Sequence, residues 1–277
     1  MINTPILHPR TKLLADSYLK SPSQALILSG PSGIGKKFIA GWLADQLELQ
    51  AITITVEPEK KMIGIDQIQQ LYVQTRSSSR LCIIIEDSHL MTQESQNAFL
   101  KLLEEPTENA YFMMTTNDPA KMLATIKSRS QAIAIHTPPP KDIEQYVNSL
   151  NSNISSDGLS SLIGSTQGLP GKLMSVLESD ETLKTHQSMI TEAKNFLSSL
   201  PKDRLDLLSQ KNFESTWVIK LVDNLALILV ALLKVAKKDS QNLRRISKQA
   251  KLIEQTSEAL AKSGNPKIHL TKLALEL

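Results

Sequence analysis

The stretch from Gly30 to Lys37 reads GPSGIGKK and is the most informative part of the chain. An apolar run that suits a buried strand precedes it, and apolar residues at helical spacing follow it. In such loops the glycines turn backbone N–H groups toward phosphates, and the lysine, here Lys36, neutralises phosphate oxygens. The pattern predicts a phosphate-binding loop, with an ordinary glycine-rich turn as the alternative. The residues expected to bind the nucleotide here are Gly30, Gly33, Gly35, Lys36 and Lys37.

The last position of this loop is unusual. A Ser or Thr normally stands there and ligates Mg²⁺ through its hydroxyl group, whereas this chain has Lys37. Two unit charges about 4 Å apart near a protein surface interact by roughly 4 kcal/mol, so an ammonium group repels a divalent ion at this place. We therefore expect ATP to bind without efficient hydrolysis, and we expect no protein metal site.

Length and composition limit the class of protein. The chain has 277 residues, a net charge of +3 and one cysteine. It is long enough for two or three domains, and its charge is too small to indicate nucleic acid by itself. Cys82 lies in an apolar run and suits a buried position, so disulfide and zinc frameworks are not expected. We find no run near the ~18 apolar residues of a membrane span and no charged leader, and we expect a soluble cytoplasmic protein with no membrane partner.

Strand-like and helix-like segments alternate up to about residue 136, which predicts a parallel α/β sheet with flanking helices. The expected strands are Ala25–Ser29, Ile52–Val56, Leu81–Ile85, Ala110–Thr115 and Ala132–His136, and the expected helices include Ile65–Thr75 and Thr92–Glu105. Three prolines after Thr137 end this pattern, and only helical patterns follow. The apolar segment Phe213–Val235 suits a core helix, and the basic run Lys234–Lys251 suits a solvated helix face rather than a DNA site. We expect domains at residues 1–136, 137–185 and 186–277.

Two carboxylates follow an apolar strand. The run from Ile83 to Asp87 reads IIIED, and nucleotide hydrolases use such a strand end to hold Mg²⁺ and to orient the attacking water. The usual order is Asp then Glu, whereas this chain has Glu86 then Asp87. A misplacement of about 1 Å can cost roughly 100-fold in rate, so the inversion is a second defect in the hydrolytic machinery. Solvated acids at a strand end are the alternative.

Polar residues also end the next strand. Thr116 and Asn117 stand where a side chain that senses the γ-phosphate is expected, although Asn117-Asp118-Pro119 is also a good turn sequence. Arg129 follows in the sequence SRS, shortly before the last strand. An arginine at such a position is usually structural or solvated, and it has no acid partner within its own segment.

Three motifs together carry a family resemblance. Residues 97–106 read NAFLKLLEEP, residues 125–130 read TIKSRS, and residues 168–172 read GLPGK. They resemble NALLKxLEEP, TIxSRC and the second-sensor helix of the clamp-loader branch of the AAA+ ATPases. The likeness is greatest to bacterial DNA polymerase III delta-prime subunits, with gamma/tau subunits next. It covers nearly the whole chain, and Asn265 to Leu277 resembles the family's last collar helix.

The resemblance implies a P-loop AAA+ domain, a small helical lid domain and an all-α collar domain. It implies a subunit that works with delta and gamma/tau subunits, the sliding clamp and primer-template DNA. In the family the arginine of the SRC motif, here Arg129, reaches into a neighbour's ATP site, and Lys172 stands where a nucleotide-sensing Arg is common. The family's cysteine-rich zinc module is missing after the loop helix. The inverted acids Glu86 and Asp87 favour a delta-prime subunit.

Two other functions are weighed. An active AAA+ motor of the gamma/tau type is the principal alternative, and it differs by hydrolysing its own ATP. A small-molecule kinase is suggested by the GPSGxGK pattern, which also resembles guanylate kinases. After residue 60 the sequence offers no acceptor-binding lid, so the kinase is disfavoured. Steady-state ATPase activity of the purified chain separates the first two readings.

Overall fold

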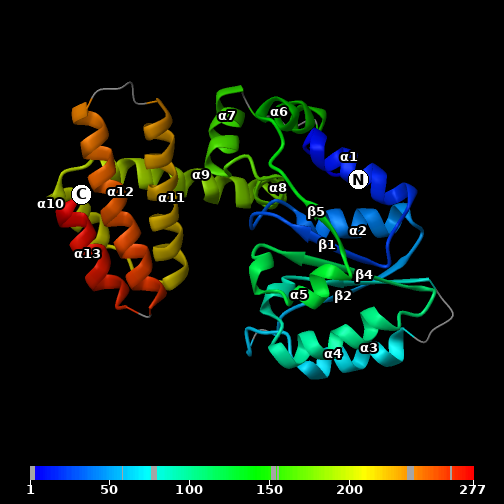
Figure 1. The fold of residues 1–277 in the computed structure, drawn as a ribbon. Coiled ribbons are helices and arrows are strands. Elements are labelled where there is room, and N and C mark those ends of the chain that lie inside the picture. Colours follow the sequence, from blue (N-terminus) through cyan, green and yellow to red (C-terminus); the bar gives the residue numbers. More distant parts are fainter. Residues whose placement is uncertain are drawn as a thin grey trace. The chain divides into compact units, whose positions relative to one another are not determined.

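The computed structural model describes residues 4–57, 59–75, 80–150, 154, 156–235, 240–262 and 264–277. The chain forms two compact units. The first comprises Met1–Ile154 and Gly168–Leu173, and the second comprises Ser155–Gln167 and Met174–Leu277. Figure 1 labels the elements of both units. The domain boundaries expected at residues 137 and 186 stay predictions.

The first unit contains a parallel sheet with the strand order β2-β3-β4-β1-β5. The strands are β1 (Ala25–Ser29), β2 (Gln50–Ile54), β3 (Leu81–Ile85), β4 (Ala110–Thr116) and β5 (Gln131–Ala134). All five residues of β3 are buried, as expected for a central parallel strand covered on both faces. Because parallel strands end at the same edge, the loop after β1 and the acidic pair after β3 lie at one edge of the sheet.

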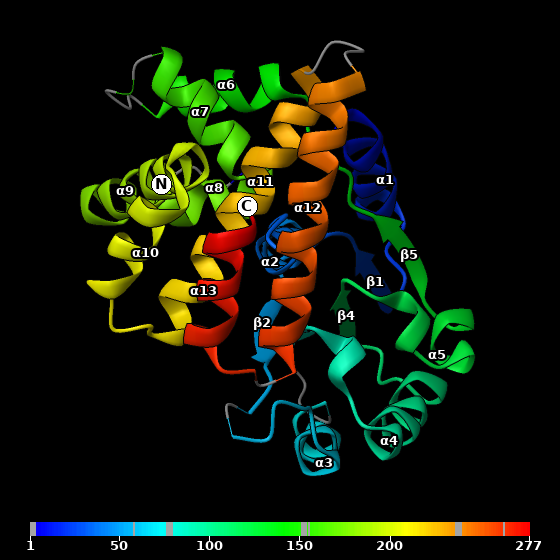
Figure 2. The same ribbon diagram turned by 90° about the vertical axis from the view of Figure 1, so that its left-hand side faces the viewer.

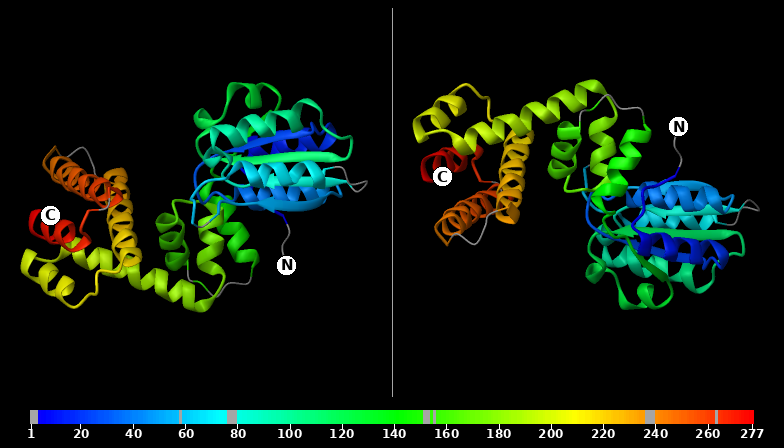
Figure 3. Two further views of the ribbon diagram at one scale, coloured as in Figure 1. Left: turned by 90° about the horizontal axis from the view of Figure 1, so that it is seen from below. Right: turned by 90° about the horizontal axis from the view of Figure 1, so that it is seen from above.

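Helices cover both faces of the sheet (Figures 1 and 3). One hydrophobic core joins α1 (Pro9–Lys20) and α2 (Lys36–Gln46) to one face. The other core joins α3 (Ile65–Gln74), α4 (Gln93–Glu104) and α5 (Ala124–Ser128) to the opposite face. Thr92 caps α4 by accepting a hydrogen bond from the backbone N–H of Ser95, which confirms the expected helix start. Burial raises the pKa of the Cys82 thiol to about 12, in agreement with a buried cysteine.

The expected edge strands were misplaced by one or two residues. The structure pairs Gln50–Ile54 with β3, whereas the sequence predicted Ile52–Val56. It pairs Gln131–Ala134 with β1, whereas Ala132–His136 was predicted. Each has only one neighbouring strand, so pairing register rather than apolar content sets its limits.

The remainder of the described chain is helical, as predicted. The helices are α6 (Pro140–Ser149), α7 (Ser156–Ser165), α8 (Pro170–Leu177), α9 (Asp180–Ser198), α10 (Pro201–Ser209), α11 (Ser215–Val235), α12 (Ser240–Ala261) and α13 (Pro266–Glu276). Helices α9 to α13 share one hydrophobic core, and Figure 2 shows α11, α12 and α13 side by side. Part of the predicted basic run, residues 236–239, lies outside the described residues.

Helix α11 lies within the apolar segment Phe213–Val235, which the sequence predicted as a core helix. Among the described residues, Ser215–Leu233 is the one helix long and apolar enough to cross a membrane by length and composition. Lys220 and Asp223 interrupt its apolar sequence, so it contains no continuous apolar run of about 18 residues. Its buried side chains, including Leu225 and Leu229, belong to the core of the helical bundle.

Candidate nucleotide-phosphate site and arginine segment

The loop between β1 and α2 has the backbone that a phosphate-binding loop needs. Gly33 has φ of 83° and Gly35 has φ of 96°, values that L side chains rarely adopt. Gly35 forms the N-cap of α2, so the first N–H groups of this helix lack intrahelical partners. The sequence predicted this arrangement because glycine alone adopts these conformations at little cost.

Lys36 is the buried cation of the loop, with an exposed fraction of 8%. Its Nζ donates hydrogen bonds to the carbonyl oxygens of Gly30 (3.0 Å) and Pro31 (3.1 Å). Burial lowers the pKa of Lys36 below its usual 10.5, and Asp87 and Glu86 oppose this shift. An ammonium group has three N–H donors, so one remains for an anion. The loop and Lys36 fit the phosphate part of a nucleotide.

The start of α8 lies directly on this loop, within the first unit. The backbone N–H of Lys172 donates to the carbonyl of Gly33 at 2.9 Å. A Cβ at Gly171 would lie 2.7 Å from that same carbonyl oxygen, and a Cβ at Gly33 would lie 2.5 Å from the side chain of Lys172. Lys172 therefore lies beside the loop, and its role in sensing the nucleotide stays a prediction. Gly171 was missed as a packing residue, although it lies in the GLPGK motif.

Lys37 occupies the surroundings expected for a metal ion. Its Nζ lies 2.8 Å from Oε2 of Glu86, and the two side chains are 53% and 30% exposed. An ammonium paired with this carboxylate does not fit Mg²⁺ between the loop and the acidic strand end. In the part of the chain that the structure describes, no group of three or more His, Cys, Asp or Glu residues could hold a metal ion.

Asp87 has a fixed backbone at the same edge. Its φ of 50° and ψ of 48° lie in the left-handed region, which Asp tolerates better than most residues. Its N–H donates to Oγ1 of Thr115 at 3.0 Å. The hydroxyl of Ser88 donates to the carbonyl oxygen of Thr115 at 3.0 Å. The sequence pointed to Asp87 and to the polar strand end Thr115-Thr116-Asn117 beside the acidic pair, but it did not single out Ser88.

His89 is another residue that the sequence analysis did not single out. Its Nδ1 is buried and is the one such side-chain atom of the described residues without a hydrogen-bond partner. Burial lowers the pKa of His89, and the nearby carboxylate of Asp87 opposes that shift. Its position two residues after the acidic pair is the only signal that the sequence offers.

The two residues predicted to sense the γ-phosphate, Thr116 and Asn117, differ in exposure. Thr116 is fully buried, and its Oγ1 accepts a hydrogen bond from the N–H of Asp118 at 3.0 Å. Asp118 in turn accepts a hydrogen bond from Ala120 and forms the turn. Asn117 is exposed. A sensing role for Thr116 and Asn117 stays a prediction, and the exposed Asn117 suits it better.

Arg129 lies at the C-terminal end of α5 and is partnered. Its Nη2 is 2.9 Å from Oε1 of Glu104, and the side chains are 40% and 49% exposed. Its Nη1 also donates to the carbonyl of Thr125 at 3.2 Å. The acid partner comes from the end of α4 rather than from the segment of Arg129. Since exposed ion pairs contribute about 0–1 kcal/mol, Arg129 is held loosely.

The sequence comparisons point to one family. Residues 48–139 match the family model described as DNA polymerase III, delta subunit. The Escherichia coli K12 protein named DNA polymerase III subunit delta-prime is 28% identical over 167 residues, 58% of this chain and 48% of that protein. The chain therefore resembles the delta-prime subunits of bacterial DNA polymerase III over part of its length. The delta-prime subunit of Pseudomonas aeruginosa is 32% identical over 135 residues, 39% of this chain and 41% of that protein.

The delta-prime likeness expected from the sequence motifs is therefore confirmed. The chain spans about half or less of the length of these curated relatives. Among solved structures, a DNA polymerase III gamma subunit-related protein from Thermotoga maritima has a TM-score of 0.61 at 19% identity, covering 96% of this chain and 97% of that one. A variant of Thermotoga maritima RuvB has a TM-score of 0.51 at 13% identity, covering 72% and 80%. These two structures show the α/β fold that the sequence predicted.

Proposed function

We propose that this chain is a clamp-loader subunit of the bacterial replicative DNA polymerase III that does not act as a motor itself. It assists ATP-dependent loading of the sliding clamp onto primer-template DNA in the cytoplasm, in a complex with delta and gamma/tau subunits. The observation that carries the non-motor part is the 2.8 Å contact between Lys37 and Glu86. The delta-prime-like relatives support the complex.

The chain's own loop binds the phosphates of ATP weakly, and the chain hydrolyses ATP slowly. Gly33, Gly35 and Lys36 supply the backbone and the charge for the phosphate groups. The ammonium of Lys37 forms an ion pair with the carboxylate of Glu86, which a divalent ion would need as a ligand. Glu86 and Asp87 also stand in the reverse order of the usual hydrolytic pair, so the attacking water lacks a well-placed base.

Arg129 acts on the neighbouring subunit. A guanidinium can stabilise the charge that develops on a transferring phosphoryl group, and Arg is better suited to this than Lys because its planar fork makes two hydrogen bonds. Arg129 is exposed and is held only by Glu104 and a backbone carbonyl, so it can be withdrawn from both at low cost. We assign it the role of an arginine finger in trans.

The helical bundle mediates assembly. Helix α11 carries exposed apolar residues at Ile219 (52%), Val230 (49%) and Leu233 (37%). Their spacing of 11 and 3 residues places them on one face of the helix. An apolar stripe of this kind on a bundle helix suits packing against a second helical bundle.

The active-motor alternative of the gamma/tau type has no observation in its favour at the loop. It requires Mg²⁺ between Lys37 and Glu86, where the ion pair lies. The two functions are separated by the steady-state ATPase activity of the purified chain.

Co-purification tests the proposed complex. A tagged full-length chain is isolated from its native cells, and the partners are identified by mass spectrometry. We expect DNA polymerase III subunits at fixed stoichiometry, and a chain that is recovered alone would contradict the proposal. Val230→Glu should reduce recovery of the partners, whereas Val73→Glu, an equally drastic change at an exposed residue of α3 (78%), should not.

A further inference from the structure

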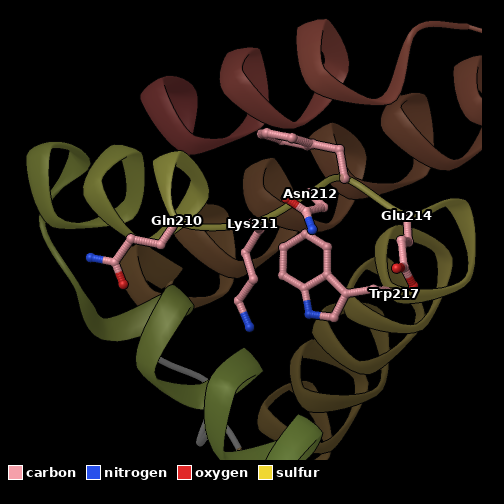
Figure 4. Close-up of a pocket in the computed structure, with 6 residues that line it drawn as sticks. Gln210, Lys211, Asn212, Glu214 and Trp217 are labelled. Atoms are coloured by element: carbon pink, nitrogen blue, oxygen red, sulfur yellow. The ribbon is translucent and has the colours of Figure 1, made fainter.

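Two pockets of the helical unit are similar in size but differ in the charged residues that line them. The first has a volume of about 250 Å³ and is lined by Gln210, Lys211, Asn212, Phe213, Glu214 and Trp217 (Figure 4). Both oxygens of Glu192 are used beside it, since Oε1 lies 2.7 Å from Lys211 Nζ and Oε2 accepts from Trp217 Nε1 at 3.1 Å. The Lys211 ammonium also lies 5.1 Å from the centre of the Trp217 ring. The ammonium of Lys211 and the indole N–H of Trp217 at this first pocket therefore already have partners.

The second pocket lies between α9, α11 and α12 and has a volume of about 210 Å³. It is lined by Lys194, Leu197, Ser198, Ile228, Leu229, Leu232, Arg245 and Gln249. Half of these residues are aliphatic. Leu229 is buried, whereas Leu232 is 47% exposed and offers apolar surface to an incoming group. The pocket is below the ~300–1,000 Å³ of typical small-molecule sites, so it suits one side chain of a larger partner.

Two cations at this pocket have no counter-ion among the described residues. Lys194 and Arg245 are both exposed, and within the described residues neither side chain makes an ion pair or hydrogen bond. Arg244 and Lys248 add positive charge to the same stretch of α12, and the first acid after them is Glu254. The surroundings of the pocket therefore attract negative charge.

We propose that this pocket, named here the α9–α12 pocket, docks an acidic peptide segment of a partner protein. An aliphatic side chain of the segment enters between Leu197, Ile228 and Leu232, and adjacent carboxylates pair with Lys194 and Arg245. Arginine is the stronger of the two anchors because its fork binds a carboxylate through two hydrogen bonds. This docking role does not depend on the function of the phosphate loop.

Single-stranded nucleic acid fits the α9–α12 pocket less well. Its binding sites combine cations with aromatic side chains on which bases stack. The lining residues of the α9–α12 pocket include no aromatic side chain. Phosphate contacts also do not need an apolar hollow, whereas an acidic peptide with an aliphatic side chain uses both features.

Fluorescence anisotropy of the full-length chain with a labelled probe tests this proposal. The probe is the peptide Gly-Asp-Glu-Asp-Glu-Leu-Leu, and the comparison peptides carry Ser for both Leu or Lys for all four acids. We expect saturable binding of the first peptide, at least about tenfold weaker binding of each comparison peptide, and at least about tenfold weaker binding of the probe by Arg245→Glu. Leu232→Ser should weaken binding of the probe without changing the net charge of the protein.

Arg244→Glu is the matched control, because it changes the charge of α12 by the same amount at the neighbouring residue, which does not line the pocket. It should retain most of the affinity. Thermal melting of each variant checks that the fold is kept, and Leu232→Ser and Arg245→Glu change exposed side chains. Equal losses in the two arginine variants, absence of binding by the probe, or tighter binding of a twelve-nucleotide oligothymidylate that Arg245→Glu abolishes would each overturn the proposal.

Discussion

Lys37 and Arg129 each lie against one glutamate, at 2.8 Å and 2.9 Å, and all four side chains are partly exposed. The surroundings of the two pairs differ. Lys37 follows the buried Lys36 at the mouth of the phosphate loop, where its partner Glu86 would otherwise serve a metal ion. Arg129 follows the end of the short helix α5 and pairs with a residue at the end of α4. In our proposal, the contact at Lys37 prevents metal binding, whereas the contact at Arg129 leaves a cation available for a neighbouring subunit.

The largest expected effect is at Arg129. In assembled complexes, Arg129→Ala should lower ATP hydrolysis at the neighbouring site, since an arginine finger contributes about 10³ to 10⁵ in rate. Bulk hydrolysis will fall less than this because only one of several interfaces is affected. Arg129→Lys should restore little of the lost ATP hydrolysis, because an ammonium group lacks the planar fork of a guanidinium group. Phosphate release and clamp loading by reconstituted complexes are the measurements.

The control for this variant is Lys127→Ala, which removes an exposed cation from the same helix. It should leave hydrolysis unchanged. If complexes that carry Arg129→Ala hydrolyse ATP and load clamps at the unmodified rate, Arg129 has only the structural contact with Glu104.

A smaller effect is expected from restoring the metal position. The triple change Lys37→Thr, Glu86→Asp and Asp87→Glu supplies a hydroxyl ligand, removes the ammonium and restores the usual order of the acids. We expect Mg²⁺ to strengthen ATP binding of this variant by about tenfold or more, on the order of 1.4 kcal/mol. The unmodified chain should show little change with Mg²⁺ in the same isothermal titration.

Lys37→Thr alone is the intermediate case. Because the inverted acids remain, it should gain some dependence on Mg²⁺ but little hydrolysis. An unmodified chain whose affinity for ATP already rises tenfold with Mg²⁺ would show that the Lys37–Glu86 pair opens readily.

The smallest effect concerns stability. Glu86→Gln and Glu104→Gln each remove one exposed ion pair, and such pairs contribute about 0–1 kcal/mol. Both variants should therefore unfold within about 1 kcal/mol of the unmodified chain in urea. A loss of several kcal/mol in either variant would mean that the pair is structural, and the comparison between the two cations would fail at that pair.

The sequence predicted the phosphate loop well because its residues act through local geometry. Positive φ at Gly33 and Gly35 and the strand-turn-helix order are properties of neighbouring residues. The contact of Gly171 with that loop joins residues more than a hundred positions apart, and periodicity carries no information about it. The limits of β2 and β5 were missed for a similar reason, since pairing register rather than local composition sets them.

The partners of the charged residues were also beyond the sequence. Lys37 was predicted to repel a metal, but the pairing with Glu86 depends on the placement of β3 beside the loop. Arg129 had no acid in its own segment, and Glu104 reaches it from α4 only through the packing of α4 on α5. The hydrogen bond from the N–H of Asp118 to the hydroxyl of Thr116 also depends on the turn after β4, and the sequence did not predict this bond.

Turnover of Mg²⁺-ATP by the purified, unmodified chain tests the central claim most directly. Phosphate release is followed at saturating nucleotide, with binding measured separately by isothermal titration. The ion pair between Lys37 and Glu86 predicts weak or moderate binding of ATP. It also predicts a turnover far below about 1 s⁻¹, the lower end of typical enzyme rates. Turnover of about 1 s⁻¹ or more would contradict the account and make the chain a motor subunit.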